Sequence, residues 1–411
     1  LGQGYFGLEG GDSHGGALSA ASLTLQILDS RFTRNSSIGG TGGHPSLLGS
    51  PSTGGSGGDA IGGAIDLRPG GTSSIHRCVI SENTARGGTG GYGKSPGLGA
   101  PANGGGLASR FRDLVVTASS LNANQATSGR FGGAGSWTPA NYYVTRGGGA
   151  SIDAGSAVFI NSTFSGNHVA QLDFSPDSRG GGLSQNSAGA SVRLQFCTLV
   201  SNIVTRVVGI GPNTESPRSR GTGLWCPTNA TVTLESTVIA ANLPGTAGDL
   251  VGRVTSTGPN LIGDAREALG LADHDRSGLD PKLGPLSDFG DGLLVHTPLL
   301  GSPLLDAATE VTSPATDQLG RPRVSGAAAD LGAVEWQVPL APLSSPRLSL
   351  LPSTSAAALR LFILAPAEAD LVLEESTDLA AWSERGRYHH GDSVDLPLTP
   401  TRGFFRLRRV N

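Results

Sequence analysis

The chain of 411 residues contains no methionine, only three cysteines, and few aromatic residues, which make up 5% of it. An odd number of cysteines without a Cys-x-x-Cys pair indicates neither a zinc site nor a disulfide framework. No apolar run reaches the roughly 18 residues of a membrane-spanning helix, so none is predicted. Because methionine is absent, we expect a processed or excised part of a longer precursor, with any signal peptide outside this sequence.

Charged residues are also scarce, at 15% of the chain, and they are scattered along it. The formal net charge is −4 and the only lysines are Lys94 and Lys282, so the sequence predicts no nucleic-acid binding. Helix-forming residues are few, and no segment keeps a helical spacing of apolar residues over several turns. These features favour an all-β protein.

Glycine is abundant, with 64 residues, and much of it belongs to a repeated frame. In each repeat unit a Gly-Gly-small-aliphatic anchor (Gly-Thr-Gly-Leu in the last) is followed 20 to 22 residues later by asparagine. The six anchors begin at Gly15, Gly62, Gly104, Gly147, Gly180 and Gly221, and the asparagines are Asn35, Asn83, Asn124, Asn167, Asn202 and Asn242. The spacing from one anchor to the next varies, so the unit is constant and the insertions between units are not.

Aligned on their asparagines, the six units share columns of similar residues. The eighth residue before Asn is always apolar: Ile27, Ile75, Val116, Phe159, Leu194 and Leu234. The third before Asn is large and apolar: Phe32, Ile80, Leu121, Phe164, Leu199 and Ile239. Such columns are typical of stacked parallel strands and predict a right-handed parallel β-helix, a solenoid, over residues 1–256. The Asn column should cap a turn by stacking its amides and by adopting a left-handed backbone.

The fifth residue before Asn is small in every unit and includes two cysteines. Cys78 and Cys197 lie three units apart in this column, roughly 14 Å at the usual strand spacing, too far to bridge. We expect both to be buried free thiols.

The repeat frame resembles that of the polymorphic outer-membrane proteins and related autotransporter passengers, which carry GGA[IL] and F-x-x-N motifs. The matching pairs here are GGAL at 15–18 with FTRN at 32–35, GGAI at 62–65 with ISEN at 80–83, and GGGA at 147–150 with FSGN at 164–167. Two of the six units keep Phe in the F-x-x-N position, so the resemblance is to this class of repeat.

Residues 257–336 contain a second ordered set of motifs, which we expect to form terminal coils that cover the end of the solenoid. GPNLIG, DPKLGPL, HTPLLGSPLLDA, TDQLGRPR and DLGAVE follow one another. This succession resembles the choice-of-anchor Q domain of exported bacterial proteins. The resemblance implies a secreted or cell-surface protein with a C-terminal anchoring module, and it implies no enzymatic activity.

A short acidic segment within this region is a candidate calcium site. Asp273, Asp275 and Asp280 are spaced like the first half of a calcium loop, with Gly278 at the turn. The bidentate glutamate is missing, because Gly284 stands at its position. A polar turn is the favoured interpretation, with calcium as the alternative and no other cofactor expected.

The last part of the chain differs again in composition. Residues 337–349 form a Pro- and Ser-rich linker, and residues 350–411 alternate as the short antiparallel strands of a small β-sandwich. LEESTDLAAW and the terminal GFFRLRR resemble a C-terminal domain of exported proteins of the Verrucomicrobia–Planctomycetes kind. That resemblance implies an anchoring or sorting module.

The insertions between units carry the candidate ligand-binding residues. They span 36–61, 84–103, 125–146, 168–179 and 203–220, and all should leave the solenoid at one corner. Aromatic and arginine side chains on adaptable loops are typical of binding surfaces for sugars or peptides. We single out Tyr92, Trp137, Tyr142, Tyr143 and Arg146. The alternative is that these insertions are neutral variation in length.

Parallel β-helices also host polysaccharide lyases and glycoside hydrolases, which need carboxylates gathered on neighbouring coils. Asp66 is the only acid in its column, where the other units place Ser19, Ala108, Ser151, Ser184 and Trp225. Acids of the insertions, such as Asp173 and Asp177, could still converge. The sequence therefore favours a non-catalytic binding or structural protein of the cell surface, whose partner is an extracellular glycan or surface protein. A carbohydrate-active enzyme is the alternative.

Overall fold

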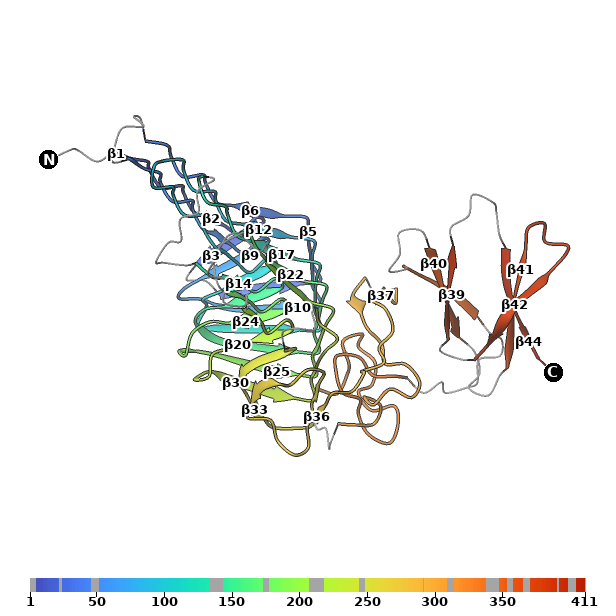
Figure 1. Ribbon diagram of the computed structural model, residues 1–411. Coiled ribbons are helices and arrows are strands. Elements are labelled where there is room, and N and C mark those ends of the chain that lie inside the picture. Colours follow the sequence, from blue (N-terminus) through green and yellow to red (C-terminus); the bar gives the residue numbers. More distant parts are fainter. Residues whose placement is uncertain are drawn as a thin grey trace.

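The structure is a computed structural model of the whole chain. It describes residues 5–21, 24–45, 52–133, 143–172, 177–206, 218–243, 248–290, 292–308, 314–337, 347–352, 358–364, 370–389, 392–397 and 404–410. Within these ranges the protein is all-β and contains no helix. Most strands belong to parallel sheets, and antiparallel sheets follow at the C-terminal end (Figure 1). The all-β prediction is confirmed.

Five parallel sheets, named here I to V, contain the strands of the repeat units. Sheet I consists of β2 (Ser13–His14), β8 (Ala60–Ile61), β13 (Ala102–Asn103), β18 (Thr145–Arg146), β23 (Asp177–Arg179) and β28 (Arg218–Arg220). Sheet II consists of β3 (Leu18–Ala21), β9 (Ile65–Arg68), β14 (Leu107–Ser109), β19 (Ala150–Ile152), β24 (Leu183–Gln185), β29 (Leu224–Trp225), β32 (Leu250–Arg253) and β35 (Glu267–Leu269).

Sheets III to V complete each unit. Sheet III consists of β4 (Thr24–Leu28), β10 (Thr72–His76), β15 (Asp113–Thr117), β20 (Gly155–Ile160), β25 (Ala190–Gln195), β30 (Thr231–Glu235) and β33 (Thr255–Ser256). Sheet IV consists of β5 (Arg31–Thr33), β11 (Val79–Ser81), β16 (Ser120–Asn122), β21 (Thr163–Ser165), β26 (Thr198–Val200), β31 (Val238–Ala240), β34 (Leu261–Ile262) and β36 (Arg276–Ser277). Sheet V consists of β6 (Ser36–Ile38), β12 (Thr84–Arg86), β17 (Gln125–Thr127), β22 (His168–Gln171) and β27 (Ile203–Arg206).

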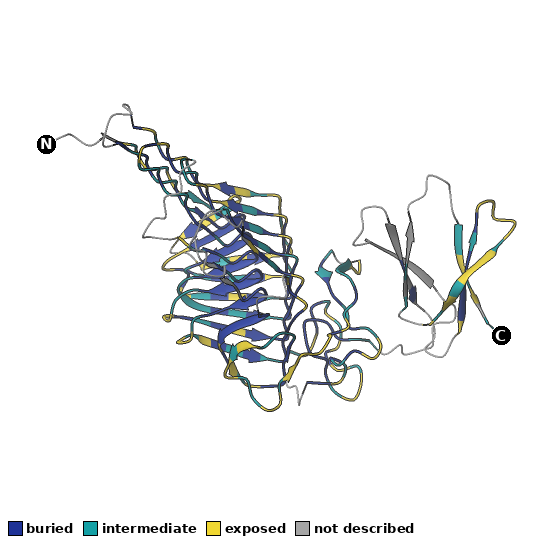
Figure 2. Cartoon of the chain, in the orientation of Figure 1, coloured by how far each residue is buried: buried dark blue, intermediate teal, exposed yellow. Residues whose placement is uncertain are grey.

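The strand register confirms the columns predicted from the sequence. In sheet III, Ile27 pairs with Ile75, and the pairing continues through Val116, Phe159, Leu194 and Leu234. In sheet IV, Phe32 pairs with Ile80, and Leu121, Phe164, Leu199 and Ile239 follow. Both columns belong to one apolar core between sheets II, III and IV, seen as the dark blue interior of Figure 2. Identical positions stack because parallel in-register strands place them directly above one another.

Each unit bends at residues with a left-handed backbone. The first anchor glycine always has a positive φ, between 58° and 69°, and a Cβ on Gly147 would lie 2.2 Å from the carbonyl oxygen of Ala150. This column must therefore be glycine. The prediction that the asparagine adopts the left-handed backbone is wrong, because the preceding residue does so, as in Glu82 (57°) and Ala123 (52°).

The asparagine side chains form a continuous ladder, as predicted. In Asn124, the side-chain amide donates to Oδ1 of Asn167 at 2.9 Å and to the carbonyl oxygen of Ile80 at 2.8 Å. Its own Oδ1 accepts the amides of Asn83. The ladder runs from Asn35 to Asn242 and ends on a carboxylate, because Asp249 Oδ1 accepts the backbone and side-chain amides of Asn242. All members beyond the first unit are buried polar groups with satisfied partners.

The cysteines are free and buried, as predicted for Cys78 and Cys197. The Cys197 thiol donates to the carbonyl oxygen of Phe159, and burial raises its pKa to about 12. Cys226, in the turn that follows β29, is also free, and burial raises its pKa to about 12 as well. These thiols are structural, because the reactive thiolate form is suppressed.

Residues 283–335 lie along the outer face of sheet IV. The parallel strands continue through β32 to β36, so the last short units consist of residues 250–277, whereas the following segment packs sideways against sheet IV. It contains the antiparallel pair β37 (Ser287–Asp288) and β38 (Leu294–Val295). Gln318 bonds Ser120 and Thr163 of two sheet IV strands, and His296 bonds Ser165.

A buried arginine fastens this segment. Arg323 is 1% exposed, stacks on the ring of Phe196 and donates to Asn161 Oδ1 and to two carbonyl oxygens of its own segment. Its charge is balanced by Asp317, Asp330 and Glu335. The TDQLGRPR and DLGAVE motifs therefore supply the two halves of one buried charge cluster.

Residues 347–410 form two three-stranded antiparallel sheets. One contains β39 (Arg347–Pro352), β40 (Ala358–Leu364) and β43 (Ser393–Pro397), and the other β42 (Ser383–Tyr388), β41 (Leu371–Ser376) and β44 (Phe404–Arg409). Leu361 and Val394 of the first sheet pack against Leu373, Phe405 and Leu407 of the second. The antiparallel character predicted for this part is confirmed. No helix capable of crossing a membrane occurs among the described residues.

Candidate functional site

The described parts of the first three insertions, together with residues 7–11 ahead of the first unit, form an ordered arm and not the adaptable loops expected from their composition. After β6, β12 and β17 the chain runs outward through 39–43, 87–91 and 129–133, and it returns to sheet I through 7–11, 54–58 and 97–101. These six extended segments form the narrow projection at the upper left of Figure 1. We call this projection the glycine arm. Near its end, β1 (Tyr5–Phe6) pairs with β7 (Ser52–Thr53).

Backbone hydrogen bonds hold the arm together without an apolar core. Gly39 and Gly42 donate to Arg86 and Thr89 of the neighbouring outward segment, at 2.9 and 2.8 Å. Gly40 and Gly43 donate to the returning segment 7–11, at 2.8 and 2.6 Å. Donors thus recur every third residue, the spacing of a polyproline II-type helix with three residues per turn.

Only glycine fits the inner positions of the arm. A Cβ on Gly88 would lie 1.9 Å from the carbonyl oxygen of Gly40, and one on Gly55 would lie 1.9 Å from that of Leu8. Collagen chains need glycine for the same reason, because the backbones approach too closely for any side chain. The Gly-Gly-x-Gly-Gly pattern of 39–43, 54–58 and 87–91 is the sequence signal that predicts this arm.

The predicted ligand-binding residues divide between the two ends of the arm. Tyr92 directly follows an outward segment and is 53% exposed. Arg146 lies at the opposite end, in β18 of sheet I, and Tyr143, which is 43% exposed, stands two residues before that strand. Trp137 and Tyr142 lie outside the described residues, between the outward segment 129–133 and Tyr143.

The arm carries exposed apolar side chains. Besides Tyr92, Phe6 is 75% exposed and Leu8 is 84% exposed, and Ile38 at the base of the arm is also exposed. Backbone fills the interior of the arm at its glycines, so these large side chains lie on its surface. Exposed apolar and aromatic groups on a rigid support are typical of a contact surface for another molecule.

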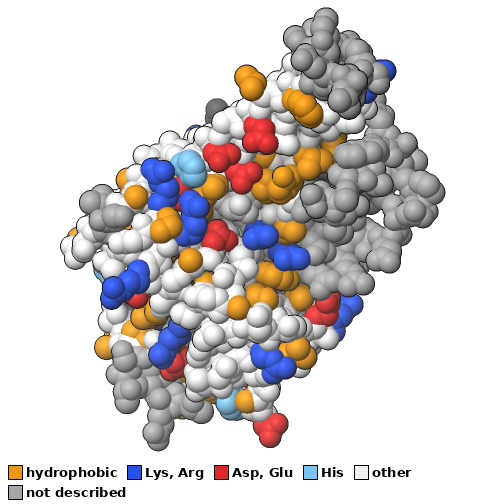
Figure 3. All heavy atoms as spheres, turned by 90° about the vertical axis from the view of Figure 1, so that its left-hand side faces the viewer, with side chains coloured by type: hydrophobic (Ala, Val, Ile, Leu, Met, Phe, Trp, Pro, Cys, Tyr) orange, Lys and Arg blue, Asp and Glu red, His pale blue; other side chains and the backbone are white. Residues whose placement is uncertain are grey.

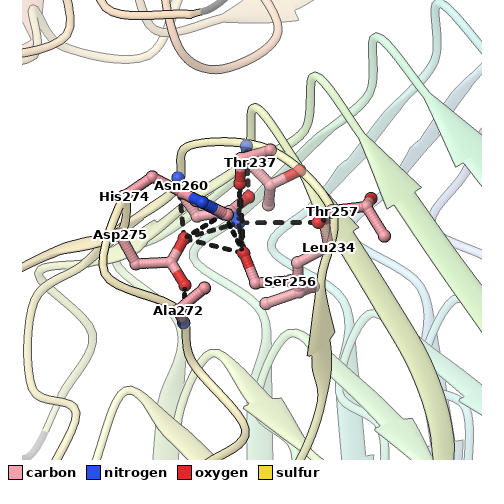
Figure 4. A network of polar contacts seen from close by, with 9 residues as sticks. Leu234, Thr237, Ser256, Thr257, Asn260, Ala272, His274 and Asp275 are labelled. Atoms are coloured by element: carbon pink, nitrogen blue, oxygen red, sulfur yellow. Dashed lines mark hydrogen bonds and ion pairs between the residues drawn. The ribbon is translucent and has the colours of Figure 1, made fainter.

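The calcium candidates have other roles in the described structure. Asp275 Oδ1 accepts the backbone and side-chain amides of Asn260 and the hydroxyl of Ser256, and its Oδ2 accepts the amide of Ala272 (Figure 4). Asn260 Oδ1 in turn accepts the amide of Thr237. Asp275 thus ends the column that contains Cys197 and Thr237, as Asp249 ends the asparagine ladder.

The other two candidates lie outside this network. Asp280 Oδ1 accepts the backbone amide of Lys282, a polar turn of the kind expected, and Asp273 is exposed. Among the residues that the structure describes, no three His, Cys, Asp or Glu side chains are placed to hold a metal ion.

Asp66 is the acid most relevant to the enzymatic alternative. It is fully buried in sheet II, with Oδ2 at 2.8 Å from Nδ1 of His14 and Oδ1 at 3.5 Å from Nη2 of Arg110. Asp153 accepts from Ser151 and Asn186 on the same sheet face. Asp173 and the side chain of Asp177 lie outside the described residues. The contacts of Asp66 are those of one buried carboxylate between two bases, and they do not include the paired carboxylates of glycoside hydrolysis.

Comparison of the chain with protein-family models, with curated proteins and with solved structures finds no match in any of the three. The resemblances to the polymorphic outer-membrane protein repeat, to the choice-of-anchor Q domain and to the C-terminal domain of exported proteins therefore stay predictions.

Proposed function

We propose that this protein is a secreted or cell-surface parallel β-helix protein of the choice-of-anchor Q type, which binds an extracellular partner through the glycine arm. The observation that carries the proposal is that successive insertions join into one hydrogen-bonded arm, whose exposed side chains include Phe6, Leu8 and Tyr92. A rigid arm presents its end without the ordering cost that a flexible loop meets on binding.

The proposed right-handed β-helix accounts for the path of the chain. Each of the first five units visits sheets I, II, III, IV and V in the same order, the sixth visits sheets I to IV, and neighbouring strands in each sheet belong to successive units. Such a solenoid is stiff along its axis, because every unit is bonded to the next. The two C-terminal antiparallel sheets would form the anchoring sandwich. The arm would then project from an anchored body.

Binding of the whole chain to a glycan array and to immobilised surface proteins tests this function. We expect a ligand whose binding falls at least tenfold in a Phe6→Ala/Tyr92→Ala double variant, since each exposed aromatic contact contributes on the order of 1 kcal/mol or more. The matched control is Phe289→Ala, an exposed aromatic residue outside the arm. Equal binding by both variants would rule out the arm as the contact surface.

A carbohydrate-active enzyme is the second candidate, and one observation favours it. Burial, followed by the charge of Asp12, raises the pKa of Asp59 to about 6, and Asp59 interacts electrostatically with His14, the partner of Asp66. A carboxylic acid that is protonated near neutral pH can serve as a general acid. Incubation with a panel of polysaccharides, followed by assays for new reducing ends and for unsaturated sugar products, tests it. Activity that is lost in Asp59→Asn would establish that the protein is an enzyme. The absence of any product would rule this candidate function out.

A further inference from the structure

In the glycine arm, every third residue of a segment points out of the bundle. A Cβ on Gly87 would lie 2.0 Å from the carbonyl oxygen of Ala100 in the returning layer, and one on Gly88 would lie 1.9 Å from that of Gly40 in the neighbouring outward segment. In a helix with three residues per turn, the third position points away from both neighbours. Glycine pairs of the returning segments are restricted in the same two directions. The arm therefore has two outer faces, one on each layer.

The outward face, formed by these third positions on the three outward segments, carries positive charge. It consists of Thr41, His44, Arg86, Thr89, Tyr92 and Arg130. Arg86 and Arg130 are exposed and lie on neighbouring segments, with Arg130 one turn farther from the body. No aspartate or glutamate occurs in residues 38–44, 86–92 or 127–133. This face therefore attracts an anionic partner.

The return face, formed in the same way on the returning segments, carries negative charge. It includes Phe6, Glu9, Asp12, Ser56, Asp59 and Leu98. No lysine or arginine occurs in residues 6–12, 53–59 or 95–101, and Lys94 stands at the far end of the arm, where the chain turns back. Figure 3 views the molecule from the left-hand side of Figure 1, toward which the arm projects, and shows acidic side chains gathered together in the upper part of that side.

The two arginines and three acids of these faces have no ion-pair partner among the residues that the structure describes. Elsewhere neighbouring units pair their charges, since Arg34 Nε lies 2.8 Å from Glu82 Oε2 and Arg193 Nη2 lies 2.6 Å from Glu235 Oε2. On the arm such pairs cannot form, because two layers of hydrogen-bonded backbone separate the cations of one face from the acids of the other.

The return face lacks positive charge at its base. The backbone amide of Asp59 donates to Asp12 Oδ1 at 2.8 Å, so the two acids are neighbours. Burial, and next the charge of Asp12, raise the pKa of Asp59 to about 6, whereas His14 lowers it. His14 is itself bonded to Asp66, with Nδ1 at 2.8 Å from Oδ2. A guanidinium placed over this face would relieve the repulsion between Asp12 and Asp59.

We propose that the outward face of one glycine arm binds the return face of a second copy of this protein. The two faces are complementary in charge, and both are flat, because glycines fill the positions between their side chains. Their rows of side chains have the same spacing, since both layers belong to the same stack of units. Contact between two outward faces would instead bring Arg86 and Arg130 of both copies together, where like charges repel.

A contact between unlike faces lets the assembly grow. It is heterologous, so the copies at the two ends keep a free outward face and a free return face for further copies. The arm is narrower than the body in Figure 1, so stacked arms fit together with their bodies on opposite sides. Such self-association needs no other ligand and can therefore fail or succeed independently of the proposed function.

Other partners would use one face only. A polyanion needs Arg86 and Arg130 alone, and a basic protein needs only the acids of the return face. A second copy needs both sets of charges. Charge reversal on each face in turn therefore distinguishes self-association from binding of another partner.

Sedimentation velocity of the whole chain tests the contact. The face is small, so we expect weak association, visible at protein concentrations on the order of 0.1 mM. The wild type should sediment as oligomers at about 0.02 M salt and as a monomer at about 0.5 M salt, because salt screens exposed charges.

Charge reversal provides the matched variants. Arg86→Glu/Arg130→Glu should weaken self-association at least tenfold, since attraction between the faces becomes repulsion. The control is Arg112→Glu/Arg253→Glu, which changes the net charge by the same amount at two exposed arginines of the body and should associate like the wild type.

Reversal of the return face, in Glu9→Lys/Asp12→Lys, should also abolish self-association. An equal mixture of the two arm variants should recover it. The reversed outward face of one variant then fits the reversed return face of the other, and their two unaltered faces fit as well.

Three outcomes would overturn the proposal. They are a wild type that stays monomeric at low salt, an equal loss in the control variant, and a mixture that does not recover association. Circular dichroism checks that each variant is folded, and the salt dependence of the wild type tests the contact even where a variant fails to fold. Loss in both arm variants, recovery in their mixture and no loss in the control would establish the contact.

Discussion

Replacing Gly88 by alanine should open the glycine arm. The new Cβ would lie 1.9 Å from the carbonyl oxygen of Gly40, whereas ordinary contact begins at 3.4 Å, so the two segments must separate by the difference, 1.5 Å. Across the same two segments, Gly39 donates to Arg86 at 2.9 Å and Gly42 donates to Thr89 at 2.8 Å. The separation would break at least these two bonds, at about 0.5–1.5 kcal/mol each, or roughly 1–3 kcal/mol together.

Hydrogen exchange measured by mass spectrometry is the suitable assay, because the arm can open locally while the sheets stay folded. We expect faster exchange in peptides that cover 39–43, 54–58 and 97–101. Gly11→Ala is the matched control, since a Cβ on Gly11 would meet no atom within 4 Å. If Gly88→Ala exchanged no faster than the wild type, or no faster than Gly11→Ala, close backbone packing would not be what holds the arm together.

Three further predictions concern the body. Asn124→Ala should lower the free energy of unfolding by about 2–4 kcal/mol in urea titration, because it leaves buried ladder groups unpaired, whereas Asn35→Ala at the open end should cost less. Burial raises the pKa of Glu335 from 4.5 to about 7, so between these pH values the folded protein holds a proton that the unfolded chain has lost. Stability should therefore fall as the pH rises from about 4.5 through about 7, and Glu335→Gln should flatten that fall in thermal melts. Arg323→Met should cost about 3–5 kcal/mol, since it leaves buried carboxylates without their cation, and should expose residues 283–335 to proteolysis. An unchanged melting temperature would contradict that role.

The interior of the sheets could be predicted because stacking is local and regular. Ile75 pairs with Ile27 and Val116 because all three hold the same position in the repeat unit, eight residues before an asparagine. The asparagine ladder follows from the same alignment. The sequence predicts a left-handed backbone at the asparagine, whereas the residue before it has this backbone. Residue types such as Glu82 and Ala123 have no preference for a left-handed backbone, so they do not signal it.

The Gly-Gly-x-Gly-Gly runs of the sequence could have predicted the glycine arm, although such runs also occur in flexible linkers. An arm of this kind differs from a flexible linker in having another backbone segment packed directly beside each glycine. Gly55 has no room for a side chain because Leu8 passes directly beside it, and Leu8 stands ahead of the first unit whereas Gly55 lies in the first insertion. Local composition therefore predicts a loop, and the packing of three insertions together makes an arm.

The sequence by itself determined the repeat unit, its apolar columns and its corner glycines, since each of these depends on one position repeated along the chain. The tertiary structure alone decided which side chains of sheet I contact sheet II. His14 meets Asp66 and Arg179 meets Trp225 across different columns of successive units. An alignment that compares like positions cannot show a contact between unlike ones, because the offset arises only when side chains of one sheet lean over the next.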